Sequence, residues 1–141
     1  MQAINTVLSL DVGTTRTGVA IARMAVGIAS PLTTLEVLPD QLAEAVVNLV
    51  KTEAAEALVI GMPRNLNGDD TEQTRIVRQI VHTLQKALTI PVYEQDEALT
   101  SKQAEDELKQ RGKPYSRGDI DALAATYILQ DFIESHPELR S

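Results

Sequence analysis

Apolar residues near the start of the chain fall into three short runs separated by turn-forming residues. The runs cover roughly residues 5–12, 16–23 and 26–38, and Pro31 interrupts the third. A proline within a strand is typical of a sheet edge, because it cannot donate a ladder hydrogen bond. Since short turns join the runs, the pattern predicts three antiparallel strands in succession.

The rest of the chain alternates between helical and strand-like patterns. Apolar residues at helical spacing or helix start signals predict helices over about residues 39–54, 71–88, 100–111 and 119–135. A short apolar run predicts a buried strand over residues 57–60, and residues 91–97 are interpreted as another strand. In the second helix, Ile76, Ile80, Leu84 and Leu88 are predicted to form one apolar row four residues apart, with Val77 and Val81 beside it.

This order of elements predicts an α/β fold with a mixed five-stranded sheet and helices packed on it. Right-handed crossovers would place the fourth and fifth strands beside the first, on the side away from the antiparallel strands. The carboxyl ends of the first, fourth and fifth strands would then share one rim, where ligands bind in open α/β sheets. We expect residues 1–141 to form one domain.

Composition narrows the class of protein. Hydrophobic residues make up 43% of the chain, but only three tyrosines and one phenylalanine are aromatic, so the core must be aliphatic. The absence of cysteine excludes disulfides and thiolate metal sites. No apolar run approaches the roughly 18 residues of a membrane span, and no signal peptide is visible, so we expect a cytoplasmic protein without membrane contacts.

The net charge of −7 argues against broad, non-specific affinity for nucleic acid. Residues 36–72 carry eight acids and two bases, whereas residues 101–118 carry five bases and three acids. The loop over residues 111–118 contains three bases and no acid. A polyanion would therefore have to bind through this local basic surface or through metal ions.

Asp11 is the only acidic residue among the first 35, and it ends an otherwise uncharged strand. A carboxylate there is costly to desolvate without a cation or a hydrogen-bond donor as partner. Glycine, threonine hydroxyls and backbone N–H groups follow it, which suits a cation, a phosphate or both. The alternative is an aspartate that only shapes a hairpin turn.

Two further carboxylates are predicted to approach the same rim. Glu97 ends the fifth strand, and Asp121 heads a helical stripe that continues through Ala125, Ile128, Leu129 and Phe132. Asp119 is rotated away from this stripe and is expected to cap the helix or face solvent. Three converging carboxylates require a cation, and Mg²⁺ or Mn²⁺ prefers such oxygen ligands. Two such ions can support phosphodiester hydrolysis.

Four motifs of the chain resemble those of the YqgF (RuvX) family. They lie at residues 11–20 (DVGTTRTGVA), 59–68 (VIGMPRNLNG), 96–101 (DEALTS) and 121–125 (DALAA). This is a family of pre-16S ribosomal RNA nucleases that resemble Holliday-junction resolvases, within the ribonuclease-H-like superfamily. The resemblance covers nearly the whole chain and implies a ribonuclease-H-like fold. It also implies that Asp11, Glu97 and Asp121 form a catalytic, metal-binding triad.

The resemblance implies cleavage of nucleic acid, in maturation of the 5′ end of 16S ribosomal RNA or on branched DNA. Two positions depart from the family pattern: Ala98 replaces a usual arginine, and Asp119 stands where a basic residue is common. These departures bear on substrate contacts more than on the fold.

We expect the residues that contact nucleic acid to flank the predicted metal site. They are Thr14, Arg16, Arg64, Asn65, Arg111, Lys113 and Arg117. The alternative for each base is a solvated surface charge.

Two other functions stay open from the sequence. One is a non-catalytic RNA- or ribosome-associated module, which the three retained carboxylates disfavour. The other is a phosphate-loop ATPase of the sugar-kinase and actin type, which needs two lobes and a far longer chain. A monomer and a homodimer are equally compatible with the sequence.

Overall fold

A computed structural model describes residues 4–65, 67–97 and 100–140, without the side chains of Thr100 and Ser101. The strands are β1 (Thr6–Val12), β2 (Thr17–Arg23), β3 (Ile28–Leu35), β4 (Ala57–Pro63) and β5 (Val92–Glu97). The helices are α1 (Pro39–Glu53), α2 (Glu72–Ala87), α3 (Thr100–Arg111) and α4 (Arg117–Ser135), followed by the short 3₁₀ helix η1 (Pro137–Arg140). The predicted elements are all present.

The five strands form one sheet in the order β3-β2-β1-β4-β5. The β1–β2 and β2–β3 pairs are antiparallel, whereas β4 pairs in parallel with both β1 and β5. This confirms the predicted mixed sheet, with the edge strand β3 on one side and the crossover strands on the other. The carboxyl ends of β1, β4 and β5 therefore share one rim.

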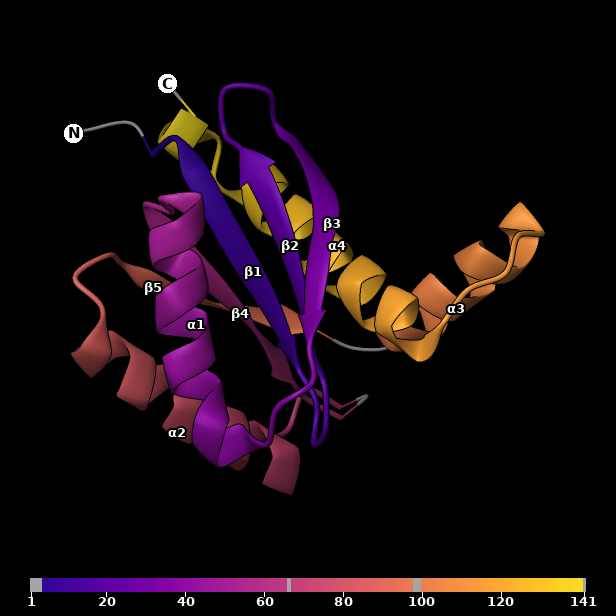
Figure 1. The fold of residues 1–141 in the computed structure, drawn as a ribbon, viewed down its shortest axis with the longest axis horizontal. Coiled ribbons are helices and arrows are strands. Elements are labelled where there is room, and N and C mark those ends of the chain that lie inside the picture. Colours follow the sequence, from indigo (N-terminus) through magenta and orange to yellow (C-terminus); the bar gives the residue numbers. More distant parts are fainter. Residues whose placement is uncertain (1–3, 66, 98–99, 141) are drawn as a thin grey trace.

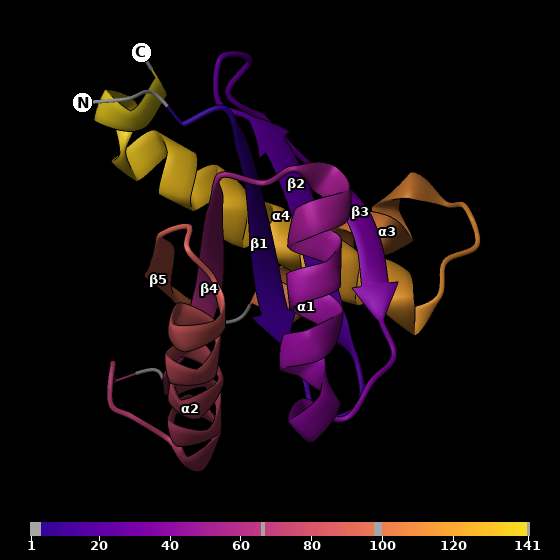
Figure 2. The same cartoon turned by 60° about the vertical axis from the view of Figure 1, so that its left-hand side comes forward.

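Helices cover both faces of the sheet (Figures 1 and 2). On one face, α1 and α2 pack on inward-facing residues such as Leu8, Leu10 and Ile60. Alternate residues, such as Val7 and Val59, pack on α4 at the other face. Within the described residues, none of the helices combines the length and apolar character that a bilayer crossing requires.

The predicted apolar row of α2 is partly wrong. Ile76 is 37% exposed, whereas Val77, Val81 and Leu84 are buried against the sheet. The buried face includes Thr74, whose hydroxyl forms a reciprocal cap with Thr71 at the start of the helix. This capped first turn contributes a polar residue to the buried face, which an apolar row cannot reveal.

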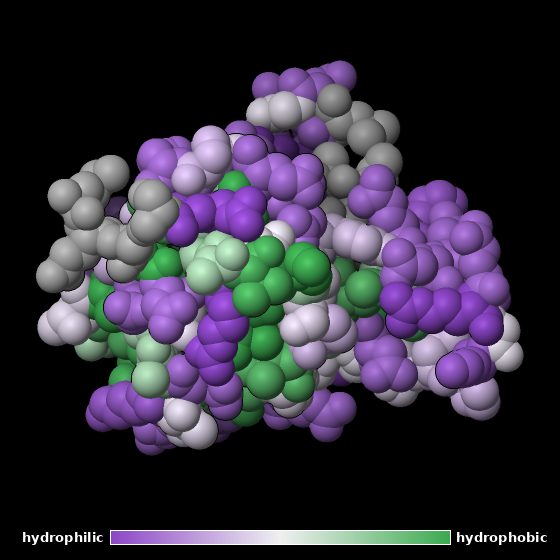
Figure 3. Space-filling model, turned by 90° about the horizontal axis from the view of Figure 1, so that it is seen from above, coloured by the Kyte–Doolittle hydropathy of each residue, from purple (hydrophilic) through white to green (hydrophobic). Residues whose placement is uncertain are grey.

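The end of the molecule formed by α3 is mostly hydrophilic (right-hand side of Figure 3). In Figure 1, α3 and the start of α4 extend away from the sheet. A small apolar cluster holds them together and includes Ala104, Leu108, Leu123 and Ala124. The predicted basic loop is therefore a corner between two packed helices: Arg111 ends α3, and Arg117 begins α4.

Candidate active site

Asp11 faces the layer that α4 occupies. Side chains alternate along a strand, and the hydroxyl of Ser9, two residues earlier on β1, donates a 2.7 Å hydrogen bond to the carbonyl oxygen of Ala125. Asp11 pairs with Gly18 across the β1–β2 ladder. After Gly13, a tight turn closes, in which the Gly13 N–H donates to the carbonyl oxygen of Arg16 at 2.9 Å. The predicted strand–turn–strand is thus confirmed.

Glycine at position 18 allows α4 to approach the sheet beside Asp11. A Cβ atom at this position would lie 1.9 Å from the carbonyl oxygen of Asp121, so any other side chain would push the helix away. Because Gly18 is the cross-strand partner of Asp11, Asp121 arrives next to Asp11. A second close approach follows at Gly61 on β4, where the Ile128 side chain fills the space of a missing side chain.

The predicted helix phase is confirmed for both aspartates of the first turns of α4. The stripe that Asp121 heads is buried, as Ala125 and Phe132 show. Asp119 instead caps the helix: its carboxylate accepts a hydrogen bond from the Ser116 N–H at 2.9 Å, and its own N–H donates to the Ser116 hydroxyl. Asp119 is therefore part of a capping box, and Asp121 faces the sheet.

Arg16 is the counter-ion of Asp121. Its Nε donates to Asp121 Oδ2 at 2.7 Å, and the exposed fractions of the two side chains are 30% and 19%. Arg16 precedes Gly18 by two residues, so both lie on the α4 side of the sheet. A charge-assisted hydrogen bond of this length in a partly buried place stabilises the charged Asp121 carboxylate.

Glu97 lies at the opposite end of the site and contacts a different group. Tyr93 packs its ring against Phe132 at a centroid distance of 5.0 Å, so the α4-facing side of β5 also carries Glu97, four residues on. Burial and a hydrogen bond with the Asp131 carboxyl are the two largest causes that raise the pKa of Glu97 to about 8. Sequence reasoning missed Asp131, because no periodicity relates this position of α4 to the end of β5.

The site carries uncompensated negative charge. Burial, followed by the nearby charge of Asp121, raises the pKa of Asp11 to about 6. The Asp11 charge also adds to the raised pKa of Glu97, which places these two carboxylates within electrostatic reach. Glu97 Oε1 is buried without a hydrogen-bond partner. A buried carboxylate oxygen without a donor is costly, and a bound cation would remove that cost.

The three predicted carboxylates share a face but do not enclose an ion as they lie. Among the described residues, no three acidic or histidine side chains form a metal-binding group. Asp121 is bonded to Arg16, and Glu97 is in contact with Asp131. The donor chemistry nevertheless fits a hard divalent cation, since all three groups supply oxygen and one oxygen lacks a partner.

The loop after β4 carries two of the predicted nucleic-acid contacts, and their side chains bond to residues outside the triad. Arg64 forms ion pairs with Asp70 and, at 3.0 Å, with Asp96. The Asn65 side-chain oxygen accepts the backbone N–H groups of residues 67 and 69 at 3.0 and 2.9 Å. Both side chains therefore shape the loop in this structure.

The other predicted contacts are spread over two surfaces. Thr14 is exposed in the turn that follows β1. Arg111, Lys113 and Arg117 are exposed at the α3–α4 corner, where Arg111 is ion-paired with Glu107 one helical turn earlier. Ala98 lies outside the described residues. The structure thus brings Arg16 into contact with the acidic site, whereas Arg111, Lys113 and Arg117 lie at the separate α3–α4 corner.

Comparison with known sequences identifies the family. Residues 5–135 match the RuvX family, described as Holliday junction resolvase. The chain belongs to the RuvX family. A relative from Chloroflexus aurantiacus, named "Putative pre-16S rRNA nuclease", is 40% identical over 92% of this chain and 86% of its own. Another with this name, from Thiobacillus denitrificans, is 38% identical over 95% of this chain and 94% of its own.

Solved structures agree with this RuvX-family assignment at the level of the fold. Thermus thermophilus RuvC superposes with a TM-score of 0.59 and 17% identity, covering 95% of this chain and 97% of RuvC. RuvC in complex with a Holliday junction substrate has the same TM-score, at 19% identity, and covers 96% and 97% of the two chains. The predicted ribonuclease-H-like architecture is thereby confirmed.

Proposed function

We propose that this chain is a metal-dependent endonuclease that hydrolyses phosphodiester bonds in nucleic acid. The proposal is supported chiefly by the electrostatic coupling of Asp11 with both Asp121 and Glu97, together with a buried, unpartnered oxygen on Glu97. Membership of a nuclease family supports the same reaction. Two of the carboxyls have raised pKa values, as expected where like charges crowd together without a cation.

Asp11, Glu97 and Asp121 would hold Mg²⁺ or Mn²⁺, with two ions as the expected number. Such ions, when bound, activate water and stabilise the leaving oxygen. The chain's own part is to orient the carboxylates on β1, β5 and α4, and to release protons from Asp11 and Glu97. Arg16 occupies Asp121 Oδ2 and therefore competes with a cation for this carboxylate, and a guanidinium released from it is available for a substrate phosphate.

We propose the 5′ end of pre-16S ribosomal RNA as the substrate, because the curated relatives carry that name. This is an RNA present in the cytoplasm. Branched DNA is the second candidate, since the family is described as a Holliday junction resolvase. A non-catalytic RNA-binding module is less well supported, because such a protein would have no need to retain all three carboxylates.

Purified protein incubated with the two substrates tests the proposal. The substrates are a pre-16S RNA fragment that spans the 5′ cleavage site and a four-way DNA junction, each with Mg²⁺, Mn²⁺ or EDTA. We expect cleavage of the RNA with either metal and none in EDTA. Cleavage of the junction alone would favour the resolvase, and binding of RNA without cleavage under all conditions would favour the binding module.

A further inference from the structure

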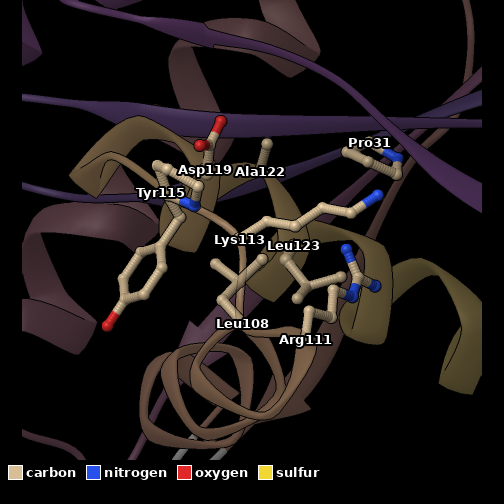
Figure 4. A pocket seen from close by; sticks show the side chains of 9 residues that line it. Pro31, Leu108, Arg111, Lys113, Tyr115, Asp119, Ala122 and Leu123 are labelled. Carbon is tan, nitrogen blue, oxygen red and sulfur yellow. The ribbon is translucent and has the colours of Figure 1, made fainter.

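A pocket separate from the carboxylates opens at the α3–α4 corner, against the edge strand β3 (Figure 4). Its volume is about 240 Å³. It is lined by Pro31, Leu108, Arg111, Lys113, Pro114, Tyr115, Asp119, Ala122 and Leu123. This volume lies below the roughly 300 Å³ at which pockets for drug-sized ligands begin, so it suits a single planar ring system.

The walls of the pocket combine an apolar, aromatic part with two bases and one acid, Asp119, whose carboxylate is engaged in the helix cap. Leu108 and Leu123 are buried beneath it, and the Tyr115 ring packs against the same small cluster. Figure 4 shows the ends of the Arg111 and Lys113 side chains towards Pro31 and the Tyr115 ring at the other side. A ring-binding wall beside two cations is complementary to a nucleotide, which joins a flat base to an anionic phosphate.

The strand and the helix that frame the pocket are joined by a hydrogen bond just outside it. The Thr34 hydroxyl on β3 donates a 2.7 Å hydrogen bond to the carbonyl oxygen of Gly118 on α4. The capping box of Ser116 and Asp119 fixes the first turn of the same helix. A second hollow continues from the pocket along β3 and shares Pro31 with it. A groove whose walls are already joined loses little entropy when a ligand binds.

We propose that this pocket binds one unpaired base of a nucleic acid strand, stacked on Tyr115, with the adjoining phosphates at Arg111 and Lys113. The proposal rests on the proposed function and adds to it a preference for single-stranded segments. Asp119 and Ala122, which line the pocket, flank Asp121 in the same turns of α4. Neighbouring helix positions differ by about 100°, so the base pocket and the catalytic carboxylate occupy adjoining faces of one helix.

The test measures whether a change in the protein and a change in the RNA strand affect binding independently of each other. The probe is a labelled single-stranded RNA of about 12 nucleotides, a length within the usual range of such sites. Binding is measured by fluorescence anisotropy in EDTA, with wild type and Tyr115→Ser, on the intact RNA and on a series with one abasic position each. We expect Tyr115→Ser to weaken binding about 5- to 20-fold, as loss of one base–aromatic stack does.

The decisive result is non-additivity. One abasic position should weaken wild-type binding by a similar factor. The same abasic position should have little further effect in Tyr115→Ser, because both changes remove the same base–tyrosine contact. Tyr115→Phe keeps the ring and should bind like wild type. Pro31→Trp fills the mouth of the pocket from β3 and should reproduce the loss without removing the tyrosine, which covers the case in which Tyr115→Ser fails to fold.

Two other results would overturn the pocket assignment. Independent losses from Tyr115→Ser and every abasic position would show that the base binds elsewhere. If Pro31→Trp bound RNA as tightly as the wild type, the pocket would not be the RNA site, and its ligand would be a protein side chain or a second copy of the chain. Failure of the proposed function is distinguishable from both, since it appears as absent cleavage with Mg²⁺ or Mn²⁺, whereas this binding measurement in EDTA does not depend on cleavage.

Discussion

The two ends of the acidic site differ in how their charge is balanced. At one end, Asp121 is bonded to Arg16, and the bases of the α3–α4 corner lie at or before the first residue of α4, the helix that carries Asp121 near its start. At the other end, Glu97 has Asp131 and Asp96 among its neighbours, which raise its pKa. Arg64, the base of the nearby loop, is ion-paired with Asp70 and Asp96 instead.

This difference indicates which task each end performs. The end with Arg16 is prepared for an anion, because its cations can exchange a carboxylate for a phosphate. The end with Glu97 is prepared for a cation, because one buried carboxylate oxygen lacks a partner and because burial, followed by the acidic neighbours, disfavours the negative charge of Glu97 in the absence of a cation. Asp11 is coupled to both ends, because the Asp121 charge raises the pKa of Asp11 and the Asp11 charge raises that of Glu97. The substrate strand is therefore expected at the Asp121 end and the tightest metal contact at the Glu97 end.

The largest expected effect is the loss of Asp11, which contributes to both ends. Asp11→Asn should reduce cleavage by about 10³-fold or more, as for other groups that act as a unit. The free energy of unfolding should hold or rise at pH 7, since burial and Asp121 disfavour the charged form of Asp11. Steady-state cleavage and thermal melts check the two parts, and full activity of this variant would refute the metal site.

The next prediction separates the two aspartates at the start of α4. Asp121→Asn should lose activity by orders of magnitude, because this side chain faces Arg16 and the sheet. Asp119→Asn is the matched control and should keep most of its activity, since its carboxylate only caps the helix. The comparison uses cleavage rates and melting temperatures of both variants. A more severe defect in Asp119→Asn would contradict the assignment.

The basic corner should set the salt dependence of binding at the Asp121 end. Replacing Arg111, Lys113 and Arg117 together by alanine should flatten the slope of log K against log salt by about two units, at about 0.7 per lost contact to a single strand. Metal binding should be unchanged. The control replaces Lys51, Arg75 and Lys86 by alanine, because these exposed bases lie on α1 and α2. An equal slope change in the control would assign the effect to net charge alone.

Removing Arg16 should leave the carboxylate at the Asp121 end without a cationic partner, as Glu97 is at the other end. Without nucleic acid, Arg16→Gln should bind Mn²⁺ about three- to tenfold more tightly, since an ion pair of about 1 kcal/mol no longer competes for Asp121. Nucleic acid binding should weaken at the same time. Calorimetric titration with Mn²⁺ measures the first effect, and Arg64→Gln is the control with no expected gain. Weaker Mn²⁺ binding by Arg16→Gln would show that the guanidinium supports the site instead of blocking it.

The smallest expected effect is a pH dependence of stability without metal. Glu97 binds its proton more tightly in the folded chain, with a pKa of about 8 against 4.5 for the free group, so stability should fall as the pH rises through this window. Because Glu97 is only half-buried, solvent screening limits the loss to about 1–2 kcal/mol. Thermal melts in EDTA measure it. Glu97→Gln should remove most of the slope, whereas Glu94→Gln, on the other face of β5, should not.

Much of the fold was predictable because it depends on local periodicity. Alternation along β1 and the helical stripe of α4 are each visible within about a dozen residues, and together they select Asp11 and Asp121. The exposed Ile76 shows the limit of this reasoning. Its row has the right period, but the contact of α2 with the sheet is centred nearer to Val77 and Val81, which were expected beside the row, so that Ile76 lies at the exposed edge.

The sequence by itself determined the elements, their order and the three carboxylates, since spacing and residue type are local properties. Only the tertiary structure decided the partners of these carboxylates. The path of α4 across β2, β1, β4 and β5 depends on the space above Gly18 and Gly61. This path brings Asp121 to Arg16, 105 positions away, and Asp131 to Glu97. Contacts between such distant positions follow from the packing of layers, which no local pattern encodes.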